Sequence, residues 1–168
     1  MKFQSDGSFH AQALGSHVYY FLHGLSEGWY VKDFTVAGHR VSGTHFELPP
    51  GSNDLSMTLS PHGATVEFAL PATRSILDAV YVLLLPQNGP VPDVETAIVA
   101  KPQQTGGLIA HSVPPGSYRV FALDATNWAL AFDPKALMEK YGKTVPLIEI
   151  GEGEHKVLPL PLTKIKLE

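Results

Sequence analysis

The chain has 168 residues, of which 44% are hydrophobic and 17% charged, and it carries a formal net charge of −4 with no cysteine. This composition supports a real core and excludes general disorder, because disordered chains combine few apolar residues with high net charge. The acidic balance and the scattered Lys and Arg residues exclude nucleic acid, whose phosphates require clustered cations. The absence of cysteine excludes disulfides and thiol chemistry.

The longest apolar run is AVYVLLL, residues 79–85. It is far shorter than the roughly 20 residues that a membrane-spanning helix needs, so no membrane span is predicted. The N-terminal stretch MKFQSDGSFHAQ has none of the charged, apolar and small-residue regions of a signal peptide. An export signal, if the parent protein has one, is expected in a longer reading frame.

Five short strands are predicted in the first sixty residues, each bounded by Gly or Pro. Trp29 to Val36 forms the clearest of them, and alternation there places Tyr30 on one face with Phe34, and Val31 on the other. Gly38-His39 is predicted as the turn that follows. The five predicted strands are residues 8–14, 17–22, 29–36, 45–48 and 54–59.

After the junction Pro61-His62-Gly63, seven further strands are predicted. The segment 77–85 is almost uninterruptedly apolar, which favours a central strand buried on both faces. The turn 151–153 is interpreted as a hairpin turn between the last two strands. The seven predicted strands are residues 64–70, 77–85, 94–100, 108–111, 117–124, 145–150 and 156–162.

One short helix is predicted between these strands. Asp133 is a suitable N-cap, Pro134 suits the first helical position, and residues 135–141 are good helix formers that end at Gly142. Two helical turns are unstable alone, so this helix must pack on the sheet. The predicted fold is all-β with tandem β-sandwich modules and one short helix. Residues 1–62 form a module that is either short or partial, and residues 63–168 form a complete sandwich.

The phrase VPPGSYRVFALD, residues 113–124, resembles the carboxypeptidase regulatory-like domains. In these small transthyretin-like or Ig-like β-sandwiches, a Pro-Gly turn leads into a strand that begins with Tyr. Residues 24–32 are similar to the same turn and strand in a preceding repeat, and residues 133–153 to the family's C-terminal insertion and closing hairpin. The stretch QQTGGL, residues 103–108, departs from the family's Asp-x-x-Gly-x-Phe hairpin.

The resemblance covers residues 63–162 and, more loosely, residues 1–62. Such domains often stand in tandem in bacterial surface and exported proteins. The resemblance therefore implies a non-catalytic structural or interaction module of a larger exported or cell-surface protein. The implied partners are other domains of the same parent protein or a surface protein.

No catalytic centre, cofactor or metal site is predicted. The eight histidines are scattered, without the close spacing and supporting carboxylates of a metal site. Ser117 follows Pro115-Gly116 at the start of a strand, where a serine ordinarily completes a turn, and no G-x-S-x-G motif is present. Glu149, Glu152 and Glu154 are interpreted as solvated acids around the last turn.

Carbohydrate binding is the alternative function. The loop after residues 117–124 holds Asp124, Asn127 and Trp128. An exposed indole ring stacks on sugars, and carboxylate and amide groups bind sugar hydroxyls. Trp128 has a competing interpretation as a core residue that covers the end of the sandwich. These three residues are the candidate binding site, with polysaccharide as the alternative partner.

Overall fold

The computed structural model of the protein describes residues 8, 15–19, 25–51, 54–69, 81–88, 96–103, 106–123 and 128–160. These residues form mainly β-strands, and none of the helices among them is long and apolar enough to cross a membrane. The predicted strand 8–14 beyond Ser8 and the first residues of the predicted strand 77–85 lie outside the described residues.

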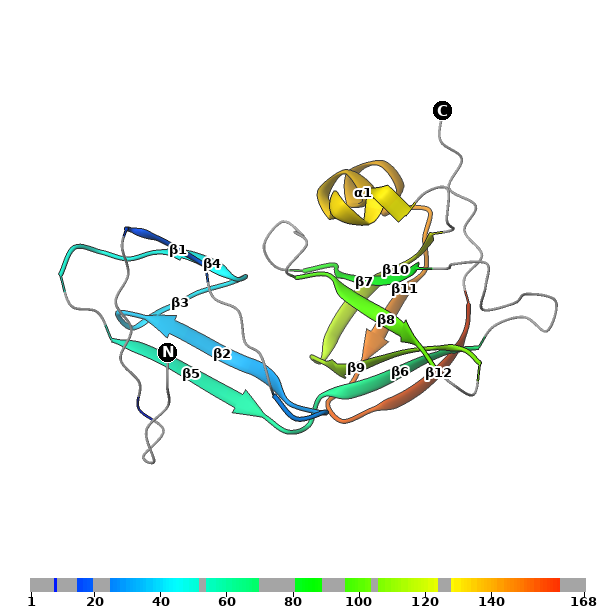
Figure 1. Cartoon of the computed structure of the whole chain (residues 1–168), viewed down its shortest axis with the longest axis horizontal. Helices are drawn as coiled ribbons and strands as arrows, with labels where there is room; N and C mark the ends of the chain where they lie inside the picture. Colours follow the sequence, from blue (N-terminus) through cyan, green and yellow to red (C-terminus); the bar gives the residue numbers. More distant parts are fainter. Residues whose placement is uncertain are drawn as a thin grey trace.

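The first five strands form two small sheets that face each other, and we call this unit the N-terminal lobe (Figure 1). The rings of Phe34 and Phe46 meet edge to face between the sheets, with centroids 5.2 Å apart, and Val36 is buried beside them. One sheet pairs β1 (His17–Tyr19) with β4 (His45–Glu47). The other has the order β3 (His39–Arg40), β2 (Tyr30–Val36), β5 (Leu55–Ser60).

The remaining seven strands form one sheet, which we call the C-terminal lobe, in the order β11-β10-β7-β8-β9-β6-β12. The middle strand β8 pairs with β7 through residues 98–100 and with β9 through Lys101 and Pro102, so the sheet folds over at β8. Phe68, Leu84 and Val120 meet in the core between the two layers. The all-β sandwich prediction is confirmed. The strands are β6 (Ala64–Ala69), β7 (Tyr81–Pro86), β8 (Ile98–Pro102), β9 (Leu108–Val113), β10 (Gly116–Leu123), β11 (Leu147–Ile150) and β12 (His155–Pro159).

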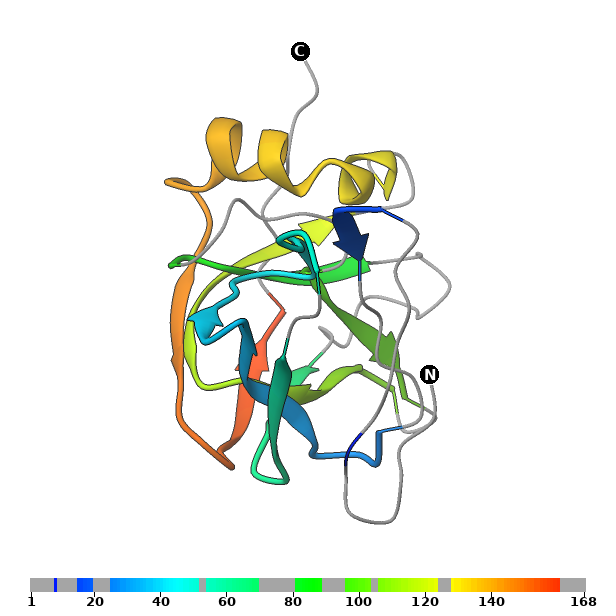
Figure 2. The same cartoon turned by 90° about the vertical axis from the view of Figure 1, so that its left-hand side faces the viewer.

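Strand β7 is buried on both faces, as its apolar run predicted. Leu84 points into the sandwich, whereas Leu83 and Leu85 point to the opposite face and pack against Leu137 of the helix α1 (Pro134–Tyr141). Figure 2 shows α1 lying across this outer face. A 3-10 helix, η2 (Trp128–Phe132), precedes α1 and was not predicted.

The helix begins and ends as the sequence predicted. The Asp133 carboxylate accepts a hydrogen bond from the Ala136 N–H at 3.0 Å, and Pro134 occupies the start of the first turn. The Gly142 N–H still bonds the Met138 carbonyl, after which the chain leaves the helix. The Asp133 side chain and Pro134 act locally at the start of the helix, which explains why the sequence alone located it.

The predicted hairpin around residues 151–153 is wrong. Strand β11 pairs with β10 at one end of the sheet, and β12 pairs in parallel with β6 at the other. The turn instead crosses between layers, because the Gly153 N–H bonds the His62 carbonyl at 2.6 Å and the Thr65 N–H bonds the Glu154 carbonyl at 2.8 Å. These two hydrogen bonds hold the last turn against the link between the lobes and the start of β6.

Two details of the N-terminal lobe also differ from prediction. The turn lies at Ala37-Gly38, and His39 already belongs to β3. In β2 the register against β5 shifts between Val31 and Asp33, so Lys32 is an extra residue that interrupts the alternation. Val31 consequently packs with the Phe34 cluster, whereas Tyr30 is not part of that cluster.

Tyr118 at the start of β10 anchors the Pro114-Pro115-Gly116 turn. Its ring is buried and its hydroxyl donates to the Pro114 carbonyl at 2.8 Å, an arrangement similar to the tyrosine corner of other sandwiches. Burial, with a smaller contribution from the nearby Tyr30, raises the pKa of Tyr118 to about 12. The folded state therefore favours the neutral phenol.

Tyr118→Phe is expected to lower the free energy of unfolding by about 1 kcal/mol at pH 7, the usual net value of such a hydrogen bond. The Tyr118 pKa in the folded protein lies above the unfolded value of about 10. The phenol's stabilisation is thus complete below pH 10 and is lost as the pH rises toward 12. Urea unfolding at pH 7 to 11 should show a shallower alkaline decline for the variant. Tyr81→Phe, at a surface position, is the control and should keep the wild-type decline.

Candidate functional site

The two lobes meet where three segments of backbone come together. Strand β5 ends at Ser60 and β6 begins at Ala64, so residues 61–63 link the lobes. The Gly63 N–H donates to the Gly28 carbonyl at 2.7 Å, and the Gly28 N–H donates to the Ser112 hydroxyl oxygen at 2.9 Å. Gly28 has φ +86°, a backbone conformation that glycine adopts without strain. The boundary between the sheets therefore lies at the predicted junction, residues 61–63.

Two β-bulges direct side chains across this junction. On β9, His111 and Ser112 together oppose the single residue Thr65 of β6, and Ser112 has φ +58°. His111 Nδ1 lies 2.6 Å from Glu27 Oε1 of the N-terminal lobe. Bulges commonly re-aim side chains in this way. The unusual backbone of Ser112 thus serves the contact between lobes.

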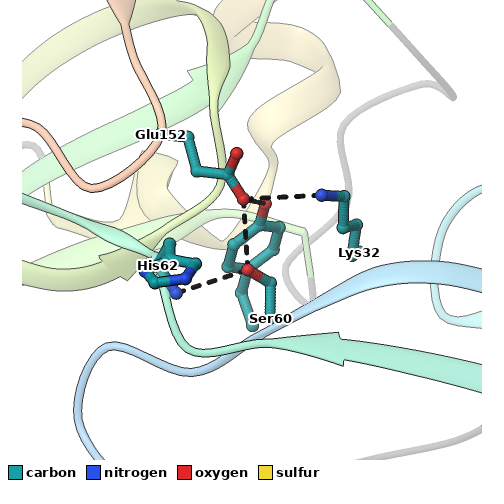
Figure 3. A network of polar contacts seen from close by, with 5 residues as sticks. Lys32, Ser60, His62 and Glu152 are labelled. Atoms are coloured by element: carbon teal, nitrogen blue, oxygen red, sulfur yellow. Dashed lines mark hydrogen bonds and ion pairs between the residues drawn. The ribbon is translucent and has the colours of Figure 1, made fainter.

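Glu152 is the centre of a polar network at the junction (Figure 3). Its Oε1 accepts hydrogen bonds from the Ser60 hydroxyl at 3.2 Å and the Tyr30 hydroxyl at 3.3 Å, and lies 3.5 Å from Lys32 Nζ. The Ser60 oxygen also accepts from the His62 N–H. The Ser60 hydrogen bond and then the Lys32 charge lower the pKa of Glu152. Glu152 therefore joins the last turn of the C-terminal lobe to β2 and β5.

A groove of about 840 Å³ lies between the lobes. Strand β2 and residues 40–44 form one wall, and side chains near the ends of β7, β8 and β9 form the other. Trp29 lines it with 39% of its surface exposed. Tyr30 and Tyr118 also line it, and both of their hydroxyls already donate within the protein. The groove thus combines aromatic rings with polar side chains.

The charged side chains that line the groove are paired. Arg40 Nε lies 2.7 Å from Asp33 Oδ1, Lys32 faces Glu152, and His111 faces Glu27. The hydroxyl of Thr44 is shielded from solvent and has no hydrogen-bond partner among the described residues. Within the described part of the chain, no group of three or more His, Asp or Glu side chains could hold a metal ion.

The side chains of the three binding residues predicted from the sequence lie outside the part of the chain that the structure describes. Asp124 and Asn127 lie outside the described residues, and the side chain of Trp128 does too, although its backbone begins η2. Sequence reasoning missed the groove. It placed Trp29 in a strand and interpreted Glu152 as a solvated acid. Tyr30 and Glu152 form a hydrogen bond although they are 122 positions apart, and no local pattern in the sequence marks such a contact.

The chain was compared with protein-family models, with curated proteins and with solved structures, and none of the three comparisons found a match. Its own residues are therefore the basis for assigning a function.

Glu152→Gln is expected to flatten the acid side of the stability profile. Because the pKa of Glu152 is lowered by folding, its stabilisation is complete above the unfolded value of about 4.3 and is lost as the pH falls through the folded value. The variant has no carboxylate at residue 152, so this part of the pH dependence should be absent from its stability profile. Urea midpoints at pH 7, 5, 4 and 3 measure this dependence, with the helix-surface variant Glu139→Gln as control. Equal acid profiles for Glu152→Gln and the wild type would contradict the anchoring role.

Proposed function

We propose that the chain is a non-catalytic structural or interaction module of a larger bacterial exported or cell-surface protein. The observation that carries the proposal is the junction. Gly28, Gly63, Ser112 and Glu152 hold the N-terminal lobe against the sandwich, and a groove remains between them. This arrangement presents a shaped surface at the meeting point of two lobes, a place where ligand sites commonly occur.

The carboxyl groups at the last turn support a structural use of the polar residues. A general acid at neutral pH needs a raised pKa. Hydrogen bonds lower the pKa of Glu152, through Ser60 first, and of Glu154, through the Gly151 N–H first. Both side chains therefore remain ionised and serve as acceptors that hold the turn and the lobes.

The assignment to a larger exported protein is supported by the resemblance of residues 113–124 to the carboxypeptidase regulatory-like domains. Its partners are then other domains of the same parent protein or a surface protein. Immunoblotting of fractionated cells of the source organism tests this. We expect a band well above 18.2 kDa in the envelope or medium. A band of that mass confined to the cytoplasm would overturn the proposal.

Carbohydrate binding is the second candidate function. The observation that favours it is the groove, in which a partly exposed Trp ring lies among hydroxyl and amide side chains. Asp124, Asn127 and Trp128 remain the alternative place for such a site.

A further inference from the structure

We propose that the groove between the lobes binds a neutral oligosaccharide, with the ring of Trp29 as the stacking surface. The proposal rests on the proposed function above, since the ligand is bound and not transformed. The groove, at about 840 Å³, lies within the roughly 300–1,000 Å³ of small-molecule sites. The groove is therefore large enough for a small organic ligand and not only for a single ion.

Trp29 offers the apolar surface that a sugar ring needs. It is one of two tryptophans in the chain, it is part of the groove lining, and 39% of its surface is exposed. Tyr30 and Tyr118 lie beside the same space with their hydroxyls bonded to Glu152 and to the Pro114 carbonyl. Those bonds keep the two rings in place. Both rings are buried, so they support the groove from below, and Trp29 is the aromatic side chain with surface left to pack against the C–H face of a sugar.

The ion pairs favour a neutral ligand. Lys32, Asp33 and Arg40 are the charged residues of the lining, and each lies within 3.5 Å of an oppositely charged side chain. The groove therefore offers a charged ligand no uncompensated charge to pair with. Sugar hydroxyls instead bond to the remaining donor and acceptor positions of paired groups.

Neutral polar side chains also line the groove: Ser42 and Thr44 on one wall and Asn88 on the other. Their hydroxyl and amide groups offer donors and acceptors for sugar hydroxyls without a charge.

Thr44 supplies an independent observation. Buried hydroxyls nearly always have a hydrogen-bond partner, yet Thr44 Oγ1 has none among the described residues. It follows Gly43, which has φ +87°, in the loop that borders the groove. A ligand hydroxyl at this wall provides the missing partner after a small movement of the loop.

The test is a titration of the whole chain with neutral cello-, xylo-, malto- and manno-oligosaccharides, followed by tryptophan fluorescence and calorimetry. Oligogalacturonate is the charged comparison. We expect a neutral oligosaccharide to change the fluorescence. Trp29→Ala should weaken its binding about tenfold or more, and Trp128→Phe should leave it unchanged. Asn88→Ala, at an exposed position, provides a second groove variant if Trp29→Ala fails to fold.

Thr44→Val separates binding from stability. It removes an unsatisfied hydroxyl from the free protein, so the melting temperature should stay equal or rise while affinity falls several-fold. Loss of binding in Trp128→Phe with retention in Trp29→Ala would move the site to residues 124–128 and overturn the proposal. Tighter binding of oligogalacturonate, or no binding of any neutral oligosaccharide by the folded wild type, would overturn it as well. Hydrolysis of a bound oligosaccharide would instead overturn the non-catalytic function and leave the groove assignment standing.

Discussion

Gly63→Ala is expected to destabilise the protein by about 3 kcal/mol, the upper part of the usual range for overpacking. A Cβ at residue 63 would lie 2.8 Å from the Gly28 carbonyl oxygen and 2.8 Å from Ser112 Cα. Both neighbours are backbone atoms, so neither can rotate away. The lobes would have to separate, and the hydrogen bond from Gly63 to Gly28 would weaken with them.

Gly15→Ala is the matched control, because a Cβ there meets no described atom within 4 Å. Urea unfolding of both variants at pH 7 gives the comparison. We expect the control to stay within about 0.5 kcal/mol of the wild type, as surface substitutions usually do. If Gly63→Ala unfolded at the wild-type midpoint, the contact of residue 63 with Gly28 and Ser112 would be wrong.

Features that depend on neighbours in sequence were predictable. The apolar run of β7 predicted burial on both faces because each face of that strand meets a different hydrophobic cluster. The start of α1 was predictable because Asp133 and Pro134 act on the backbone within one turn. In both cases the physical cause lies inside the segment itself.

Features that depend on distant partners were not predictable. The turn 151–153 has the glycines of a hairpin, but the Gly153 N–H bonds the His62 carbonyl, and the neighbouring Glu154 carbonyl accepts from the Thr65 N–H. The bulges at Lys32 and at His111-Ser112 add one residue to a strand without any change in residue type that marks them. The candidate groove could not be predicted for the same reason. Its walls come from both lobes, and the bulges direct some of its side chains.

Phe121→Ala is expected to cost about 3–5 kcal/mol, the largest stability effect that we predict for the chain. Phe121 lies on β10, is fully buried, and packs in one cluster with Leu83, Leu85 and Leu137. Removal of its ring leaves a cavity between the sheet and α1. The strand around Phe121 pairs with β7 along residues 118–123, so the sheet cannot easily collapse into the space.

Phe121→Ala should also weaken the packing of α1 on the sheet, so that the helix unfolds more easily. A helix of eight residues is unstable without packing, and Leu137 is the side chain that buries it against Phe121 and its neighbours. Far-UV circular dichroism should therefore lose helical signal at urea concentrations below the main transition. Phe132→Ala is the control, since that ring is 62% exposed at the end of η2. Comparable losses of helical signal and stability in the two variants would contradict this role, because Phe121 lies in the cluster between the sheet and α1, whereas most of the Phe132 ring is exposed.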